Sequence, residues 1–270
     1  RRVLFRSYFY DLHIHSCLSP CSDEDMTPNN IVNMALLKGL DIIAVSDHNS
    51  VDQLQTILSI GSQAGLLVVP AMELCTAEEI HLLCLFPSLE AAACVAGKVF
   101  ESVAVPVNRP DIFGHQWILD EEDEPIREVP HMLLAASGLD VESALSAIRA
   151  VGGVAIPAHV DRDAFSIMAT LGSIPPEYDL RVVEASRGFF PMLEPLNTGT
   201  SLRGQDMSAG IPPVDTSGLL PCLMNSDAHH LWDISEPEQA VELPERSASA
   251  LLEALTTGRG LMYGFRQNPP

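Results

Sequence analysis

The sequence is short of positive charge, of aromatic side chains and of long hydrophobic runs. Only 15 of its 270 residues are Lys or Arg, against 36 Asp and Glu, which gives a formal net charge of −21. Because such a chain repels a polyphosphate backbone, and because only 6% of it is aromatic, we expect no long nucleic acid among its partners. The apolar runs, such as residues 66–72, fall far short of the roughly 20 residues of a membrane-spanning helix, so we also expect no membrane partner.

The sequence also lacks the cysteine pattern of a disulfide framework or a structural zinc site. Its six cysteines include no CxxC pair and are widely spaced. The first ten residues contain Arg1, Arg2 and Arg6 without a following apolar stretch, so no secretory signal is expected. These features predict a reduced, cytoplasmic compartment.

Apolar runs and helical patterns alternate along the chain. Apolar residues make up 47% of it and charged residues 19%, which excludes disorder as the main state. The expected strands are residues 8–13, 40–46, 66–72, 80–86, 153–158, 181–185, 221–225 and 260–263. The expected helices are 52–64, 89–103, 141–151, 247–257 and one from Thr27-Pro28 to Gly39. The alternation predicts a parallel α/β sheet, open or closed into a barrel.

Two irregular stretches interrupt this pattern. Residues 106–130 include an acidic run, and residues 174–213 are rich in Pro and Gly. Irregular stretches of this length in compact domains often serve as lids over a functional site. No linker separates two units, so we expect a single domain over 1–270, with 106–130 and 174–213 as candidate lid segments.

Histidines and acids gather at the ends of the expected strands. Two pairs, His13 with His15 and Asp227 with His229, have the i and i+2 spacing that points side chains the same way in an extended chain. The carboxyl ends of parallel strands open on one face of a sheet or barrel, so these side chains are expected to meet there.

Imidazole nitrogens with carboxylate oxygens suit zinc, manganese or iron. The candidate ligands are His13, His15, Asp23, His48, Glu73, His81, His159, Asp227 and His229. Because one catalytic ion needs only three or four protein ligands, this number predicts two or three divalent ions. Glu73, with two carboxylate oxygens to offer, is the expected bridging ligand.

The order of these motifs resembles the polymerase and histidinol phosphatase (PHP) family. The matching runs are DLHIHS at 11–16, GLDIIAVSDHN at 39–49, AME at 71–73 with His81 eight residues on, IPAH at 156–159 and NSDAH at 225–229. The resemblance implies a distorted (β/α)7 barrel of the TIM-like kind, a trinuclear metal site and hydrolysis of phosphate esters. It also implies that the His, Glu and Asp residues named above, Asp23 aside, are the ligands.

One ligand position departs from the family pattern. Many members have an Asp five residues after the second His of the first motif, where this chain has Pro20. Counting back from Pro28, the family's helix-starting Pro, places the Asp at Asp23, which requires a three-residue insertion. Asp25 and Cys21 are the rival candidates.

The expected mechanism is attack on phosphorus by a hydroxide, because divalent ions lower the pKa of water from about 15.7 towards about 7. Glu73 and Asp227 are expected to serve catalysis by holding the ions. Arg162 is the best-placed cation for the phosphoryl oxygens, and a surface pairing with Asp161 or Asp163 is its alternative. His131 and Glu184 are further candidates for substrate binding. The alternative for His131 is a partly buried structural role. The alternatives for Glu184 are a carboxylate that supports the metal ligands and a capping or salt-bridged Glu.

These features together predict a metal-dependent phosphoesterase that hydrolyses a small phosphomonoester or short nucleotide. One alternative is an amide or lactone hydrolase of the metal-dependent amidohydrolase type. Such enzymes often use a carboxylated Lys, whereas Lys38 and Lys98, the two lysines of this chain, lie in expected helices. The other alternative is a non-catalytic metal-binding accessory domain, in which loss of ligands is expected.

Overall fold

The computed structural model describes residues 4–101, 103–187, 194–195, 219–261 and 263–266. Its strands are β1 (Arg6–Ile14), β2 (Ile42–Val45), β3 (Leu67–Cys75), β4 (His81–Leu85), β5 (Trp117–Leu119), β6 (Pro125–Glu128), β7 (Val154–Pro157), β8 (Val183–Ala185), β9 (Glu194–Pro195), β10 (Leu219–Met224), β11 (Ala240–Leu243) and β12 (Tyr263–Arg266). Its α-helices are α1 (Pro28–Leu37), α2 (Leu54–Ala64), α3 (Leu89–Val99), α4 (Pro110–Phe113), α5 (Val141–Ala150), α6 (Ile167–Leu171) and α7 (Ala248–Thr257). The described residues also include two short 3₁₀ helices, η1 (Pro176–Tyr178) and η3 (Leu231–Asp233).

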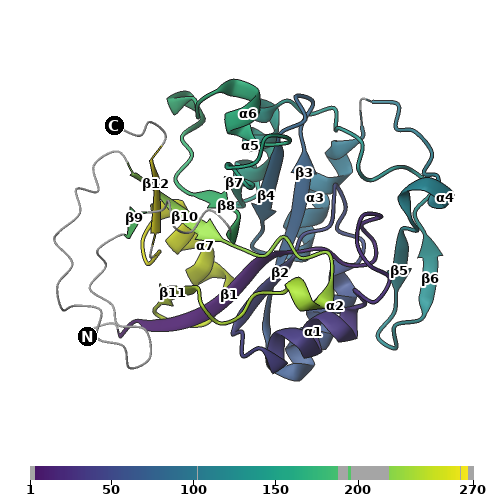
Figure 1. Cartoon of the computed structure of the whole chain (residues 1–270), viewed down its shortest axis with the longest axis horizontal. Helices are drawn as coiled ribbons and strands as arrows, with labels where there is room; N and C mark the ends of the chain where they lie inside the picture. Colours follow the sequence, from purple (N-terminus) through teal and green to yellow (C-terminus); the bar gives the residue numbers. More distant parts are fainter. Residues whose placement is uncertain (1–3, 102, 188–193, 196–218, 262, 267–270) are drawn as a thin grey trace.

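The main sheet has six strands in the order β11-β1-β2-β3-β4-β7 and is curled into half a barrel (Figure 1). A second sheet, in the order β8-β10-β12-β9, lies beside it. The two sheets meet near the carboxyl ends of β1 and β7. Ile14, at the end of β1, forms a parallel bridge with Ala228, which follows β10. Val160 N–H, just after β7, donates to the carbonyl oxygen of Glu184 in β8. The protein is therefore a mixed α/β fold in which the curled main sheet and the second sheet meet along one edge.

The expectation of an all-parallel sheet is wrong for two strands of the main sheet. β1, β2 and β3 are parallel, but β4 is antiparallel to both β3 and β7, and β11 is antiparallel to β1. The reason for β4 is chain length, because a parallel crossover needs a dozen or more residues and only residues 76–80 connect β3 to β4. The reversal pairs His81, at the start of β4, with Cys75, at the end of β3. His81 therefore lies at the same edge as the ends of the parallel strands.

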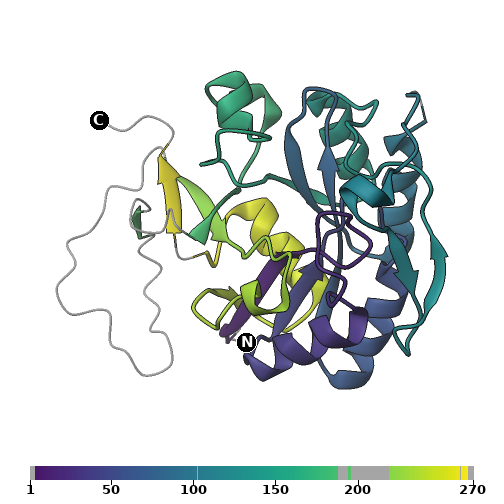
Figure 2. The ribbon, with the colours of Figure 1, turned by 45° about the vertical axis from the view of Figure 1, so that its right-hand side comes forward.

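Local signals in the sequence fix the helices. The Thr27 side chain accepts a hydrogen bond from Asn30 N–H, Pro28 begins α1, and Gly39 follows its end with a φ of +78°. α7 lies within the expected range 247–257 and has Ser247 as its N-cap, whereas α3 ends at Val99 rather than continuing to residue 103. Helices α1 and α2 pack together against β1 and β2 through a buried apolar cluster (Figure 2).

The stretch 106–130 is more ordered than the sequence indicates. It contains α4 and the antiparallel hairpin β5–β6, which the sequence analysis missed because β6 is mostly exposed and β5 is short. Gln53, the residue before α2, anchors the hairpin, since its amide donates to the Leu119 carbonyl and accepts from Leu119 N–H. The Asp123 carboxylate accepts hydrogen bonds from Thr27 and Asn29. The role of residues 106–130 as a lid stays a prediction, and so does the single-domain organisation. Most of the other candidate lid, 174–213, lies outside the described residues.

None of the described helices is long and apolar enough to cross a membrane. All six cysteines are free thiols, four of them buried. The cytoplasmic location stays a prediction.

Candidate metal centre

Most of the candidate ligands meet at the shared edge of the two sheets. We call this group the histidine–carboxylate cluster: His13, His15, His48, Glu73, His81, His159, Asp227 and His229. Ligand atoms within it form three groups in which every pair lies within 4.8 Å. The groups are His15–His48–His229, His13–His15–Glu73–Asp227 and His48–Glu73–His81. Because they share members, a set of neighbouring ions fits better than one isolated ion.

Glu73 lies at the centre of the cluster. Its carboxylate oxygens are 2.9 Å from His81 Nδ1, 3.0 Å from His48 Nδ1 and 3.2 Å from His159 Nε2. The same oxygens are 3.4 Å from Nε2 of both His13 and His15. A carboxylate in contact with five imidazoles has the position that a bridging ligand requires.

The orientation of the His13 ring is fixed by a carboxylate on the side of the ring that faces away from the cluster. Glu184 lies 3.0 Å from His13 Nδ1, and because a carboxylate only accepts, Nδ1 must carry the proton and donate it. Glu184 is held in turn by the Asn225 side chain at 2.8 Å. His13 Nε2 is therefore turned towards the cluster, which is how outer carboxylates orient metal-binding imidazoles.

His15 and His229 are oriented in the same way. His15 Nδ1 donates to Ser19 Oγ at 3.1 Å, because the Ser19 hydroxyl itself donates to Asp47 at 2.7 Å. His229 Nδ1 lies 2.8 Å from the Asp227 carbonyl oxygen, which can only accept. Both imidazoles consequently present Nε2 to the cluster.

The buried carboxylates of the cluster need positive charge nearby, and its own side chains can supply that charge only if histidines are protonated. Burial alone lowers the pKa of His13, but the negative charges of Glu184, Glu73 and Asp227 outweigh burial and raise that pKa well above its ordinary value. Burial likewise works against ionisation of Glu73, yet the charges of His81, His13 and His48 keep its pKa well below the usual range. The site therefore favours a cation between its carboxylates.

A divalent ion fits this requirement better than protons do. Nε2 atoms of His13 and His15 lie only 3.2 Å apart, and burial with the neighbouring charges of His48 and His229 lowers the pKa of His15 well below normal. Nδ1 of His159 is buried without a hydrogen-bond partner among the described residues, and His48 Nδ1 has only the ion-pair contact with Glu73. Neutral imidazole nitrogens and carboxylate oxygens are the donor set of zinc, manganese and iron.

Backbone conformation marks the same place. Asn49, His159 and Asp227 have positive φ angles of 51°, 31° and 50°, in the left-handed region that residues other than Gly seldom adopt. Each follows the carboxyl end of β2, β7 or β10. Such backbone strain concentrates at functional sites because the surrounding structure must hold it in place.

Arg162 points to the cluster. Its Nη1 lies 2.6 Å from Asp227 Oδ2, and its side chain is 46% exposed. It does not pair with Asp161, whose carboxylate accepts from Ser186 N–H. Arg162 thus stands between the buried carboxylate and solvent.

The three candidates for the departing ligand position lie at the rim. The Asp23 side chain is 39% exposed and its carboxylate is 3.4 Å from His230 Nδ1, outside the three ligand groups. Burial and the negative charge of Glu73 raise the pKa of the Cys21 thiol to about 12. Asp25 is exposed. The assignment of Asp23 stays a prediction.

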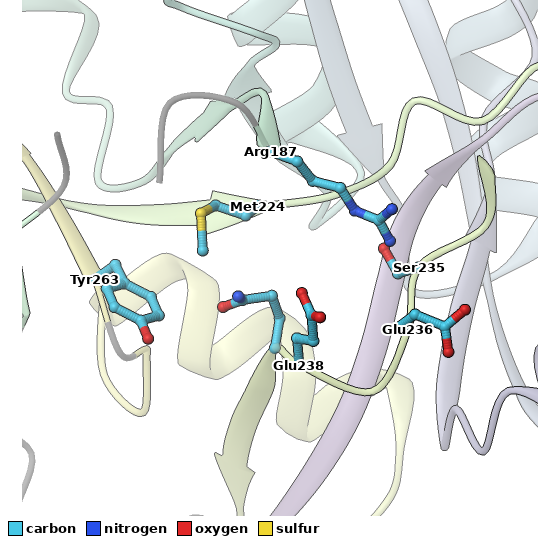
Figure 3. Close-up of a pocket in the computed structure, with 7 residues that line it drawn as sticks. Arg187, Met224, Ser235, Glu236, Glu238 and Tyr263 are labelled. Carbon is cyan, nitrogen blue, oxygen red and sulfur yellow. The ribbon is translucent and has the colours of Figure 1, made fainter. Parts of the chain in front are cut away.

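His131 and Arg187 lie apart from the cluster. The His131 ring packs edge-on against Phe100, with a centroid distance of 5.3 Å, and its described contacts do not include the cluster. Arg187 instead lines a cavity of about 320 Å³ and extends towards Ser235, with Tyr263 on the opposite side of the cavity (Figure 3).

Sequence reasoning missed the residues that hold this edge together. Asp11 is fully buried and accepts from the backbone N–H groups of Ser226 and Ser235, which ties β1 to the segment after β10. Ser19 and Asn225, which support His15 and Glu184, were likewise not singled out. Asp11 and Asn225 lie within the quoted motifs, but only the fold shows which partners their side chains reach.

No protein family model and no curated protein sequence matches the chain. Solved structures do: the lesion-specific Endonuclease Q from Pyrococcus furiosus has a TM-score of 0.57 at 17% identity, over 96% of this chain and 58% of that one. A complex of Endonuclease Q with a 27-mer duplex substrate has a TM-score of 0.56 at 17% identity, over 93% and 56% of the two chains. A two-domain protein from Bacteroides vulgatus, described as containing a predicted PHP-like metal-dependent phosphoesterase, has a TM-score of 0.50 at 15% identity, over 97% and 65%.

These structures define the class to which the fold belongs. The chain has the fold of PHP-like proteins, which confirms the resemblance of its motifs at the level of the fold. The chain spans less than two thirds of the length of each of these three structures.

The comparison corrects one expectation. We expected no long nucleic acid partner because of the net charge of −21. Endonuclease Q, which shares this fold, is seen with a 27-mer duplex carrying an abasic lesion at its active site. The inference from net charge was wrong because overall charge says little about one site whose bound ions are absent from the count.

Proposed function

We propose that the chain is a metal-dependent phosphoester hydrolase of the PHP type, with its curled sheet forming part of a distorted PHP-type barrel. The observation that carries this proposal is the set of three ligand groups that share His15, His48 and Glu73. We propose as ligands the eight residues of the histidine–carboxylate cluster, with Asp23 as a ninth at the rim. Two or three divalent ions, of manganese, zinc or iron, fit the donor set.

In this proposal, some side chains of the site would hold the metal ions and others would position the ligands or the substrate. Bound divalent ions would supply a hydroxide near neutral pH and polarise the phosphoryl oxygens. Glu73 and Asp227 balance their positive charge, and Glu184 keeps His13 in the required tautomer. Arg162, with an exposed guanidinium beside Asp227, is in position to bind a phosphoryl oxygen of the substrate.

The substrate class includes nucleic acid strands as well as small phosphate esters. The likeness to Endonuclease Q supports a phosphodiester in a strand, and the PHP-like resemblance supports small phosphate esters. Amide hydrolysis through a carboxylated Lys finds no support, because Lys98 is exposed on α3 and Lys38 binds Glu236 and nearby carbonyls.

A release assay with defined substrates tests the proposal. Metal-free protein is loaded with manganese, zinc or iron and offered nucleotides, sugar phosphates, an intact duplex and the same duplex with one abasic position. We expect hydrolysis of at least one phosphate ester that depends on added metal and is lost in Glu73→Gln and Asp227→Asn. Gln63→Ala, an exposed change on α2, is the matched control. Hydrolysis that persists in both cluster variants would contradict the proposal.

A further inference from the structure

Trp232 is an exposed aromatic side chain in η3, close in sequence to the histidine–carboxylate cluster. It is 70% exposed, although Trp has one of the largest apolar surfaces of any residue. Its ring lies almost parallel to that of His230, with a centroid distance of 4.6 Å and an interplanar angle of 6°. One face of the indole is thus covered by an imidazole, and the side chain remains open to solvent.

The backbone around Trp232 is held firmly. Lys38, whose side chain is only 13% exposed, donates to the carbonyl of Trp232 at 3.0 Å and to that of Ile234 at 2.5 Å. It also pairs with Glu236 at 3.1 Å. A buried lysine that binds three successive parts of one loop fixes the position of that loop, and with it the exposed indole.

Trp232 lies close to the histidine–carboxylate cluster. Trp232 follows His229, a cluster member, by three residues, so their Cα atoms are at most about 11 Å apart. A nucleic acid strand advances about 3.4 Å per nucleotide along the axis of a duplex. A phosphate at the cluster would therefore place bases of its own or neighbouring nucleotides near the indole.

We propose that Trp232, backed by His230, is a stacking platform for a nucleobase of the substrate whose phosphate is hydrolysed at the cluster. This inference rests on the proposed function and names its substrate class as nucleotide-containing. Base stacking on an aromatic ring needs no positive charge, which suits a chain with 36 acidic residues. His230 covers one face of the indole, and Asp233, the next residue along the chain, is also polar.

Tryptophan fluorescence can report on Trp232 alone, because the chain has only one other tryptophan, Trp117. In Trp117→Phe, all tryptophan emission comes from Trp232. The probes are a phosphorothioate-linked single strand of five nucleotides, which resists hydrolysis, and the same strand without bases. With zinc-loaded protein, we expect the base-containing strand to quench the emission and the base-free strand to leave it nearly unchanged. Equal responses to the two strands, or no response, would overturn the proposal.

Affinity measurements supply an independent readout. Trp232→Ala should weaken binding of the base-containing strand by roughly 5- to 100-fold, whereas Trp232→Tyr should retain most of it. Trp117→Ala is the matched control, because Trp117 also stacks on a histidine, His115, but in the β5–β6 hairpin. Unchanged affinity in Trp232→Ala would reject the platform. Hydrolysis by Trp232→Ala of a base-free strand with ordinary phosphodiester links shows whether the phosphoesterase itself survives, so the two proposals fail separately.

Discussion

At the scale of single residues, the cluster depends on hydrogen bonds made on the far side of its imidazoles. Glu184, Ser19 and the Asp227 carbonyl each fix one Nδ1, so that Nε2 faces inward. The sequence predicted which residue types would gather here because their spacing marks strand ends. It offered Glu184 as a supporting carboxylate but could not name its partner, since Glu184 and His13 are 171 positions apart and only the fold brings them together.

We predict that Glu184→Gln lowers metal affinity about 10- to 100-fold, because the loss of its charge weakens the hold on the His13 imidazole. Equilibrium dialysis followed by elemental analysis measures this effect. Glu238→Gln, a carboxylate in the neighbouring cavity, is the control. An unchanged metal affinity in Glu184→Gln would show that the carboxylate does not support a ligand.

We also predict that Arg162→Ala raises KM roughly 10- to 100-fold, the range of a lost charge-assisted hydrogen bond. The pairing with Asp227 contributes little to folding, because the guanidinium is half exposed. Steady-state kinetics separates KM from kcat, and denaturation confirms the fold. Unchanged kinetics would remove Arg162 from the substrate site.

At the scale of elements, the positions of helices and strands followed from the sequence better than their directions. Thr27, followed by Pro28, predicted the start of α1 because its side chain bonds locally. The antiparallel direction of β4 was missed because apolar runs carry no information about direction. The hairpin β5–β6 was missed because β5 has only three residues and β6 is mostly exposed, and side chains of other elements hold it.

The anchoring of that hairpin can be tested at Gln53, which is 1% exposed. Gln53→Ala removes two hydrogen bonds to Leu119 and leaves a buried backbone N–H and carbonyl without these partners. We predict a loss of about 2 to 3 kcal/mol in the free energy of unfolding, measured by urea denaturation. Gln63→Ala, which removes only exposed hydrogen bonds to Ser59 and to Glu121 of the hairpin turn, should cost less than about 0.5 kcal/mol. Equal effects of the two changes would show that the hairpin is held elsewhere.

At the scale of the whole molecule, charge balance links the site to stability. The negative charge of Glu73 raises the pKa of His81 from 6.5 to about 10 in spite of burial, which acts in the opposite direction, and the pKa of His13 is raised as well. A group with a raised pKa in the folded state contributes stability that is present below its unfolded pKa and is lost as the pH rises through its folded pKa. The metal-free protein should therefore depend on these protons.

We predict that the metal-free protein loses stability as the pH rises from 6.5 to 8.5, by up to about 1.4 kcal/mol per pH unit for each such group. Bound divalent ions replace the protons, so the metal-loaded protein should not show this loss. Thermal denaturation at several pH values measures both forms, and His81→Gln should reduce the slope of the metal-free form. A metal-free protein that gains stability over this range would contradict the charge balance described for the cluster.

The central claim is that eight side chains, drawn from residues 13 to 229, hold a group of divalent ions around Glu73. Anomalous X-ray scattering from crystals of the protein, recorded at the absorption edges of manganese, iron and zinc, locates such ions directly. We predict two or three peaks a few ångströms apart, with one on each side of the Glu73 carboxylate. An absence of peaks at these residues, or peaks scattered elsewhere on the molecule, would contradict the account.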